Sequence, residues 1–251
     1  MYCYQCEQTA KGIACTKAGV CGKDPETAAL QDVLIHVAKG VSMYAHRARA
    51  LGAVDREADV FVIEALFTTV TNVNFDPERL AGLIKRGVRV RRRVKGLYEE
   101  AVHKNGGVPD ELTGAASFEP ESELGALIAQ GKQVSIESRQ DNLGADIAGL
   151  QELMLYGLKG AAAYVDHAIV LGLEDEELFA MFHEGMDYLT VKSPSADDLL
   201  AWCLKTGEIN MRAMEVLDSA NTGAYGHPEP TSVRVTPVTG KAILVSGHDL
   251  K

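Results

Sequence analysis

The chain has 251 residues, with 25 Lys and Arg against 35 Asp and Glu, so its formal net charge is −10. This balance argues against nucleic acid or an anionic membrane as the main partner. Apolar residues make up 46% of the chain and charged residues 24%, which excludes wholesale disorder. No run approaches the roughly 18 apolar residues of a membrane span, and residues 1–8 lack the features of a secretory signal. We therefore expect a cytoplasmic protein.

The first 23 residues hold four of the five cysteines, Cys3, Cys6, Cys15 and Cys21. A cytoplasmic chain does not rely on structural disulfides, so this cluster indicates metal or redox chemistry. Four neighbouring thiolates repel one another and need a cation, which zinc or an iron–sulfur cluster supplies. Residues 1–23 are therefore predicted to be a cluster-binding loop.

The spacing of these cysteines is C-x2-C-x8-C-x5-C. Structural zinc sites usually have two separated C-x2-C pairs, and only the first pair here has that form. Gly12, Gly19 and Gly22 give the chain freedom to wrap a bulky group. The pattern favours an iron–sulfur cluster over zinc, with a chance grouping as the third interpretation.

Three helices are predicted in residues 24–107, which we take as the first three-helix unit. The first begins at Asp24-Pro25 and runs to Leu51, before Gly52. The second begins near Asp55 and continues to about Val70. The third begins at Asp76-Pro77 and reaches about His103.

Residues 108–222 are predicted to form a second three-helix unit. Within 106–140 we expect a loop with one short helix near 121–130. Four further helices are expected, over 146–171, 174–190, 196–205 and 208–220.

The last segment, 223–251, is predicted to be a linker and the first strand of an incomplete α/β domain. Ala242 to Ser246 is a continuous apolar run that ends in Gly247-His248-Asp249, typical of a buried parallel strand entering a turn. One buried strand cannot satisfy its own backbone hydrogen bonds, so a partner or further chain must complete the sheet.

The two helical units resemble each other. A shift of 120 residues aligns 39–87 with 159–207 without a gap and gives 13 identities in 49 positions. Lys39-Gly40 then meets Lys159-Gly160. We interpret this match as an internal repeat, the alternative being a shared bias toward helix-forming residues. The predicted fold is thus mainly α, with two three-helix bundles followed by the first strand of a truncated α/β domain.

A dense basic run occupies residues 85–95, in the third predicted helix. Its positive side chains spread around most of the helix, which favours a solvated helix. The alternative is a docking patch for an acidic electron donor.

Several segments resemble the hybrid cluster protein family, also known as prismane proteins or hydroxylamine reductases. The resemblance extends from the first residue to the last. The segments that carry it are Met1–Thr9, Gly19–Lys23, Leu30–Asp32, Gly157–Tyr164, Leu217–Glu229 and Ile243–Lys251.

The resemblance implies an N-terminal helical domain of two three-helix bundles, followed by two α/β domains. It also implies that Cys3, Cys6, Cys15 and Cys21 hold a [4Fe–4S] cluster. In this family a second, hybrid [4Fe–2O–2S] cluster binds the substrate, and its histidine ligand maps to His248. Its other ligands come from later domains, so this chain would carry only the N-terminal part. Cys203 matches no ligand motif and is expected to be a buried core thiol.

The implied activity is the reduction of hydroxylamine to ammonia and water, and also of nitric oxide, with electrons from a redox donor protein. The resemblance does not specify the oligomeric state. Because the other hybrid-cluster ligands are absent, the 251-residue chain alone is expected to be inactive. The rival hypothesis is a stand-alone electron-transfer or scaffold module with one cluster and no substrate site.

Overall fold

The computed structural model describes residues 1–232, 234–237 and 239–243 of the chain. Its regular structure is helical, and the one strand-like contact among these residues is an isolated antiparallel bridge between Cys3 and Cys15. None of the described helices is both long enough and apolar enough to cross a membrane. The elements in chain order are η1 (Ala10–Gly12), α1 (Pro25–Ala50), α2 (Arg56–Thr68), α3 (Pro77–Lys104), η2 (Gly114–Ser117), α4 (Leu124–Gly131), α5 (Ile136–Leu143), α6 (Ala145–Val170), α7 (Glu176–Tyr188) and α8 (Ala196–Tyr225).

The helices of the first half begin where the capping residues predict. The Asp24 carboxylate accepts a hydrogen bond from the backbone N–H of Thr27 at 2.6 Å, with Pro25 at the first helical position. The Asp55 carboxylate caps α2 through the N–H of Ala58 at 2.9 Å. An N-terminal cap satisfies backbone donors that the helix itself leaves unpaired, which fixes the starting residue. Asp76 caps α3 in the same way, accepting from the N–H of Arg79 at 3.1 Å, so the predicted starts of the first three helices are confirmed.

The helix boundaries repeat along the chain. α6 and α7 begin and end 120 residues after α1 and α2, respectively. α8 corresponds to α3 in the same way, except that it is one residue longer at each end. The sequence match of 39–87 with 159–207 thus coincides with a repeat of helix boundaries.

The two sets of helices share one hydrophobic core. α1 packs along α3, and α6 packs along α8, within each half. The middle helices cross over, since α2 also packs against α6, and α7 packs against α1. Phe61 of α2 and Phe179 and Phe182 of α7 are among the largest fully buried side chains. The division into separate units at residues 107 and 108 stays a prediction.

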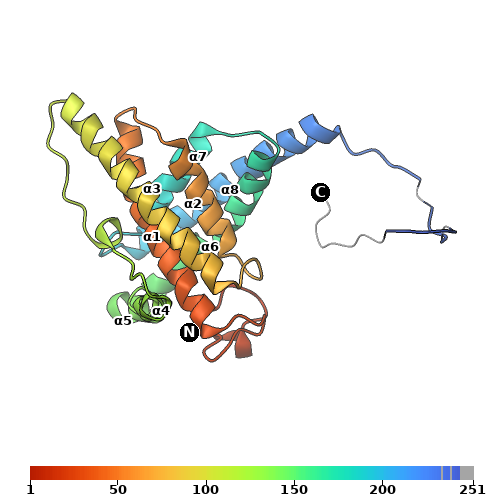
Figure 1. Ribbon diagram of the computed structural model, residues 1–251, viewed down its shortest axis with the longest axis horizontal. Helices are drawn as coiled ribbons and strands as arrows, with labels where there is room; N and C mark the ends of the chain where they lie inside the picture. Colours follow the sequence, from red (N-terminus) through yellow and green to blue (C-terminus); the bar gives the residue numbers. More distant parts are fainter. Residues whose placement is uncertain (233, 238, 244–251) are drawn as a thin grey trace.

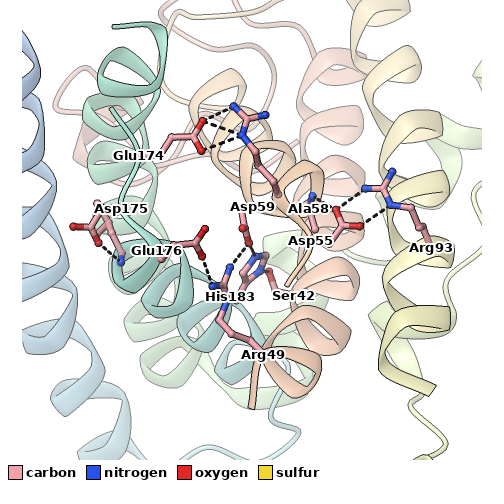
Figure 2. Close-up of polar contacts among 12 residues, drawn as sticks. Ser42, Arg49, Asp55, Ala58, Asp59, Arg93, Glu174, Asp175, Glu176 and His183 are labelled. Atoms are coloured by element: carbon pink, nitrogen blue, oxygen red, sulfur yellow. Dashed lines mark hydrogen bonds and ion pairs between the residues drawn. The ribbon is translucent and has the colours of Figure 1, made fainter. Parts of the chain in front are cut away.

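A buried polar network joins α1, α2 and α7 (Figure 2). His183 of α7 lies with Nε2 2.8 Å from Asp59 Oδ1 and Nδ1 3.0 Å from Ser42 Oγ. Arg49 Nη2 donates to the same Asp59 oxygen at 2.6 Å, and Arg49 Nη1 donates to Glu176 at 2.7 Å. Ser42, Asp59 and His183 are each at most 2% exposed, so the network fixes α7 on α1 and α2 inside the core.

Two helix predictions are wrong. The helices expected over 196–205 and 208–220 are one continuous helix, α8, because Gly207 lowers helix stability without ending the helix. At this point α6 approaches α8 so closely that a Cβ on Gly157 would lie 2.6 Å from Thr206 Cγ2, and this packing supports the helix across the break. The second error is α5, which lies in the predicted loop; Ser135 caps it by accepting from the N–H of Ser138 at 3.2 Å.

After α8 the described residues leave the helical body without regular structure (Figure 1). The predicted strand from Ala242 to Ser246 lies partly outside the described residues. Ala242 and Ile243 are described, and both are exposed and outside any strand. The strand and the incomplete α/β domain therefore stay predictions.

Candidate functional site

The N-terminal loop folds back on itself so that its cysteines meet. Cys3 and Cys15 pair as a short antiparallel bridge, with Cys3 N–H to Cys15 O at 3.2 Å and Cys15 N–H to Cys3 O at 2.8 Å. A tight turn brings Cys21 round: the Gly22 N–H donates to Gly19 O at 2.9 Å, and Gly22 has a φ of 92°, which glycine adopts without strain.

All four predicted ligands line one cavity of about 20 Å³. Cys3, Cys6, Cys15 and Cys21 are free thiols, and the backbone N–H of Ala10 lies 3.5 Å from Cys15 Sγ. Among the described residues, no group of three or more His, Cys, Asp or Glu side chains is arranged to hold a single metal ion.

Four thiols with a backbone N–H donor beside one sulfur match the donor set of an iron–sulfur cluster. The cavity itself has about the volume of one water molecule, so binding a four-iron cluster requires the loop to widen.

Polar contacts hold this loop on the helical body. Gln5, between Cys3 and Cys6, donates through Nε2 to Thr71 Oγ1 at 2.9 Å. Its Oε1 accepts from Lys159 Nζ of α6 at 2.9 Å. Lys23, two residues after Cys21, donates to Gln31 Oε1 of α1 at 2.6 Å. Both ends of the cysteine loop are therefore anchored to the first helix of a repeat.

A larger cavity of about 350 Å³ lies beside the loop, between α1 and α6, and Cys3 lines it as well as the small cavity. Ionisable groups are unusually frequent in its wall. They are Tyr2, Cys3, Lys23, Asp32, His36, Lys39, Arg139, Glu152, Tyr156, Lys159 and Lys192.

Burial changes the proton affinity of several of these groups. It lowers the pKa of Lys39 to about 7 and that of His36 to about 4, because water no longer stabilises their charged forms. It also raises the pKa of Asp32 and lowers that of Lys159. Perturbed groups that share one cavity are typical of functional sites.

Sequence reasoning did not identify this cavity. A signal was present, because polar residues interrupt the apolar stripe of α1 at Gln31, Asp32 and Lys39. The 120-residue shift places Gln151, Glu152 and Lys159 at the same positions of α6.

The remaining candidates are distributed as follows. His248 lies outside the described residues, so its assignment as a hybrid-cluster ligand stays a prediction. Cys203 is half-buried, packs against the hydrophobic core and lines a groove between α6 and α8. Burial raises its pKa. It lies on a different element from the other four cysteines.

The basic run of α3 is largely neutralised by neighbouring acids. Arg93 pairs with Asp55 and Glu57 of the α2 region, and Arg91 and Arg92 both pair with Glu119. These contacts favour the solvated-helix interpretation over a docking patch for an acidic partner.

Comparison with known proteins assigns this helical chain, with its four clustered cysteines, to a protein family. The model of the Prismane/CO dehydrogenase family matches residues 1–251, and the chain belongs to that family.

Among curated relatives, the chain is 48% identical over 254 residues to the hydroxylamine reductase of Acidithiobacillus ferrooxidans. It is 49% identical over 251 residues to that of Rhodospirillum rubrum and 50% identical over 251 residues to that of Syntrophobacter fumaroxidans. Each alignment covers 100% of this chain but only 45–46% of the relative, so the chain spans about half the length of these relatives.

Proposed function

We propose that this chain is the N-terminal, cluster-binding part of a hydroxylamine reductase. The observation that carries the proposal is the meeting of Cys3, Cys6, Cys15 and Cys21 around one cavity, in a chain similar along its whole length to proteins of that name. In this proposal the four thiolates hold a [4Fe–4S] cluster. When bound, such a cluster stores and transfers single electrons.

The residues around the cysteines have definable tasks in this proposal. The Ala10 N–H donates toward Cys15 Sγ, and a hydrogen bond to a ligating sulfur stabilises its negative charge. Gln5 and Lys159 hold the segment between Cys3 and Cys6 against α6, which fixes the position of those two thiolates. Lys159 and Lys23 also place positive charge beside the thiolates.

The complete protein would reduce hydroxylamine with two electrons and two protons, giving ammonia and water. Nitric oxide is a second proposed substrate, and a redox protein is the proposed electron donor. In the complete protein His248 would be one ligand of a hybrid iron–sulfur–oxygen cluster. The other ligands would come from domains that follow.

Cluster content tests the proposal directly. Anaerobically prepared chain should contain about four irons and four sulfides per molecule and give the electron paramagnetic resonance signal of a reduced cubane. Stoichiometric zinc without a visible absorption band would contradict it.

Substitution of one ligand should remove the cluster. Cys15→Ala should abolish the iron and sulfide content and loosen residues 1–23, because that segment contributes little to the core. Cys203→Ala is the matched control and should retain the full cluster. Equal iron content in both variants would show that the N-terminal cysteines are not the ligands.

The 251-residue chain alone should reduce hydroxylamine negligibly, although it carries the proposed electron-storing cluster. Of the proposed hybrid-cluster ligands it supplies only His248. An assay with a chemical electron donor, with metal content verified, checks this expectation. The same assay on a chain extended by the missing domains should show turnover, and His248→Ala in the extended chain should abolish it. Rapid turnover by the short chain would place the active site elsewhere.

A further inference from the structure

The large cavity between α1 and α6 is built from both copies of the repeat. Five residue pairs related by the 120-residue shift all line it. These pairs are Gln31 and Gln151, Asp32 and Glu152, Ile35 and Leu155, His36 and Tyr156, and Lys39 and Lys159. Polar and charged side chains buried between two helices lower the stability of the fold unless they have hydrogen-bond partners, counter-charges or a ligand.

The two copies use these residues differently. On α6 both charged groups have partners, because Glu152 pairs with Arg139 at 2.5 Å and Lys159 donates to Gln5. On α1 neither Asp32 nor Lys39 has a hydrogen bond or ion pair with any residue that the structure describes. Lys39 is nonetheless only 6% exposed. The amide oxygen of Gln151, a residue 2% exposed, is likewise without a partner in the described part of the chain.

The charges in this wall do not balance. The cavity wall has five cations, Lys23, Lys39, Arg139, Lys159 and the exposed Lys192, against the two carboxylates of Asp32 and Glu152. The cavity therefore carries three surplus positive charges when all are ionised. Lys23 and Lys159 donate to neutral amide or carbonyl oxygens rather than to carboxylates. Buried positive charge without a counter-charge attracts an anion strongly at low dielectric.

We propose that this cavity is a binding site for a small inorganic oxyanion, with Lys39 as its principal cation. Lys39 Nζ supplies up to three donors, and the amide NH2 of Gln151, which also lines the cavity, is a further donor. The Gln151 amide oxygen cannot bond the anion and would accept from a water beside it. A volume of about 350 Å³ holds an oxyanion together with several waters. The site does not rest on the function proposed above, because the donors proposed for the anion are Lys39 and Gln151 and not Cys3, which also lines the cavity.

Acidic conditions should tighten this binding. Lys39 has a pKa of about 7, so it becomes fully charged as the pH falls below 7, while burial favours the neutral form of Asp32. His36, with a pKa of about 4, stays neutral near pH 7. The other charged or titratable groups that line the cavity with Lys39 come from the loop, α5, α6 and the segment after α7: Tyr2, Cys3, Lys23, Arg139, Glu152, Tyr156, Lys159 and Lys192.

Isothermal titration of the intact chain with sodium sulfate tests the site, with sodium chloride at equal ionic strength as the reference titration. We expect saturable sulfate binding at pH 6.5 that weakens about tenfold or more by pH 8.5, as Lys39 loses its proton. Lys39→Met should weaken it by about tenfold or more, the usual effect of losing a hydrogen bond to a charged group. The matched charge control is Lys85→Met, at an exposed position of α3, which should bind sulfate like the unmodified chain.

A second variant has the opposite expected effect. Asp32→Asn removes a carboxylate from the cavity and should tighten sulfate binding near pH 7, where Asp32 and Lys39 are both partly charged. The test therefore does not depend on the folding of Lys39→Met alone. Any of three results would overturn the proposal: no saturable binding, equal affinity in Lys39→Met and Lys85→Met, or equal heats for sulfate and chloride. The cations of the cavity wall would then serve only to balance the negative charge of the neighbouring cysteine loop.

Discussion

Gly40→Ala should destabilise the protein, whereas the same substitution at the repeat-related Gly160 should stabilise it. A Cβ on Gly40 would lie 2.1 Å from Ala115 O and 2.7 Å from Ala115 C, both backbone atoms of η2. η2 cannot simply withdraw, because Arg91 Nη1 donates to Ala115 O at 3.1 Å and also to Phe118 O. Overpacking of this kind costs about 1–3 kcal/mol, and a clash with anchored backbone belongs at the upper end.

Gly160 is the matched control, since it has the same place in α6 that Gly40 has in α1. A Cβ there would meet no atom within 4 Å. Alanine in an open helix interior is favoured over glycine by about 1 kcal/mol, so Gly160→Ala should raise the free energy of unfolding. Urea unfolding followed by circular dichroism gives both values. Changes of the same sign in the two variants would contradict the close η2 contact.

Asp59→Ala should produce a second large loss of stability. Asp59 is 2% exposed, and its Oδ1 contacts both Arg49 and His183 (Figure 2). Removal of one partner leaves buried polar groups uncompensated, and breaking a buried ion pair in this way costs about 3–5 kcal/mol. The effect should appear as a lower urea midpoint with an unchanged denaturant slope.

The ion pair between Arg56 and Glu174 provides the control, because it joins the same two regions at the surface (Figure 2). Glu174→Ala should leave the free energy of unfolding nearly unchanged, since water screens exposed pairs. If both variants lost equal stability, the buried network would not be the main attachment of α7 to α1 and α2.

Much of the helical pattern could be predicted because its signals are local. Asp24-Pro25 and Asp55 mark helix starts through contacts within one turn, and Gly172 follows α6 with a φ of 86°. The two wrong predictions concern positions that distant residues decide. In the sequence Gly207 favours a helix end, but in the structure packing against α6 keeps α8 continuous there. The start of α5 has only the Ser135 cap as a local signal.

Of the two candidate sites, local sequence signals predict one, and the packing of distant segments determines the other. Close spacing indicated that the four N-terminal cysteines act together, and the structure brings them to one cavity. Lys39, Glu152 and Arg139 are far apart in the sequence, so their meeting depends on how α1, α5 and α6 pack. The 120-residue repeat does relate cavity residues of α1 to cavity residues of α6. Most of these pairs, such as Asp32 and Glu152, lie upstream of the matched segments 39–87 and 159–207.

The crossing of the middle helices makes the two halves interdependent. α2 covers part of α6 and α7 covers part of α1, so a chain cut within the segment after α3 would leave an apolar face open on each half. Neither half then has a complete core, and the free energy that holds one half folded is supplied partly by the other. The helical body should therefore unfold cooperatively in a single transition, with coincident loss of helix and of tertiary packing. A half produced alone could bury its open apolar face to a similar extent only by pairing with another copy of itself or with the other half.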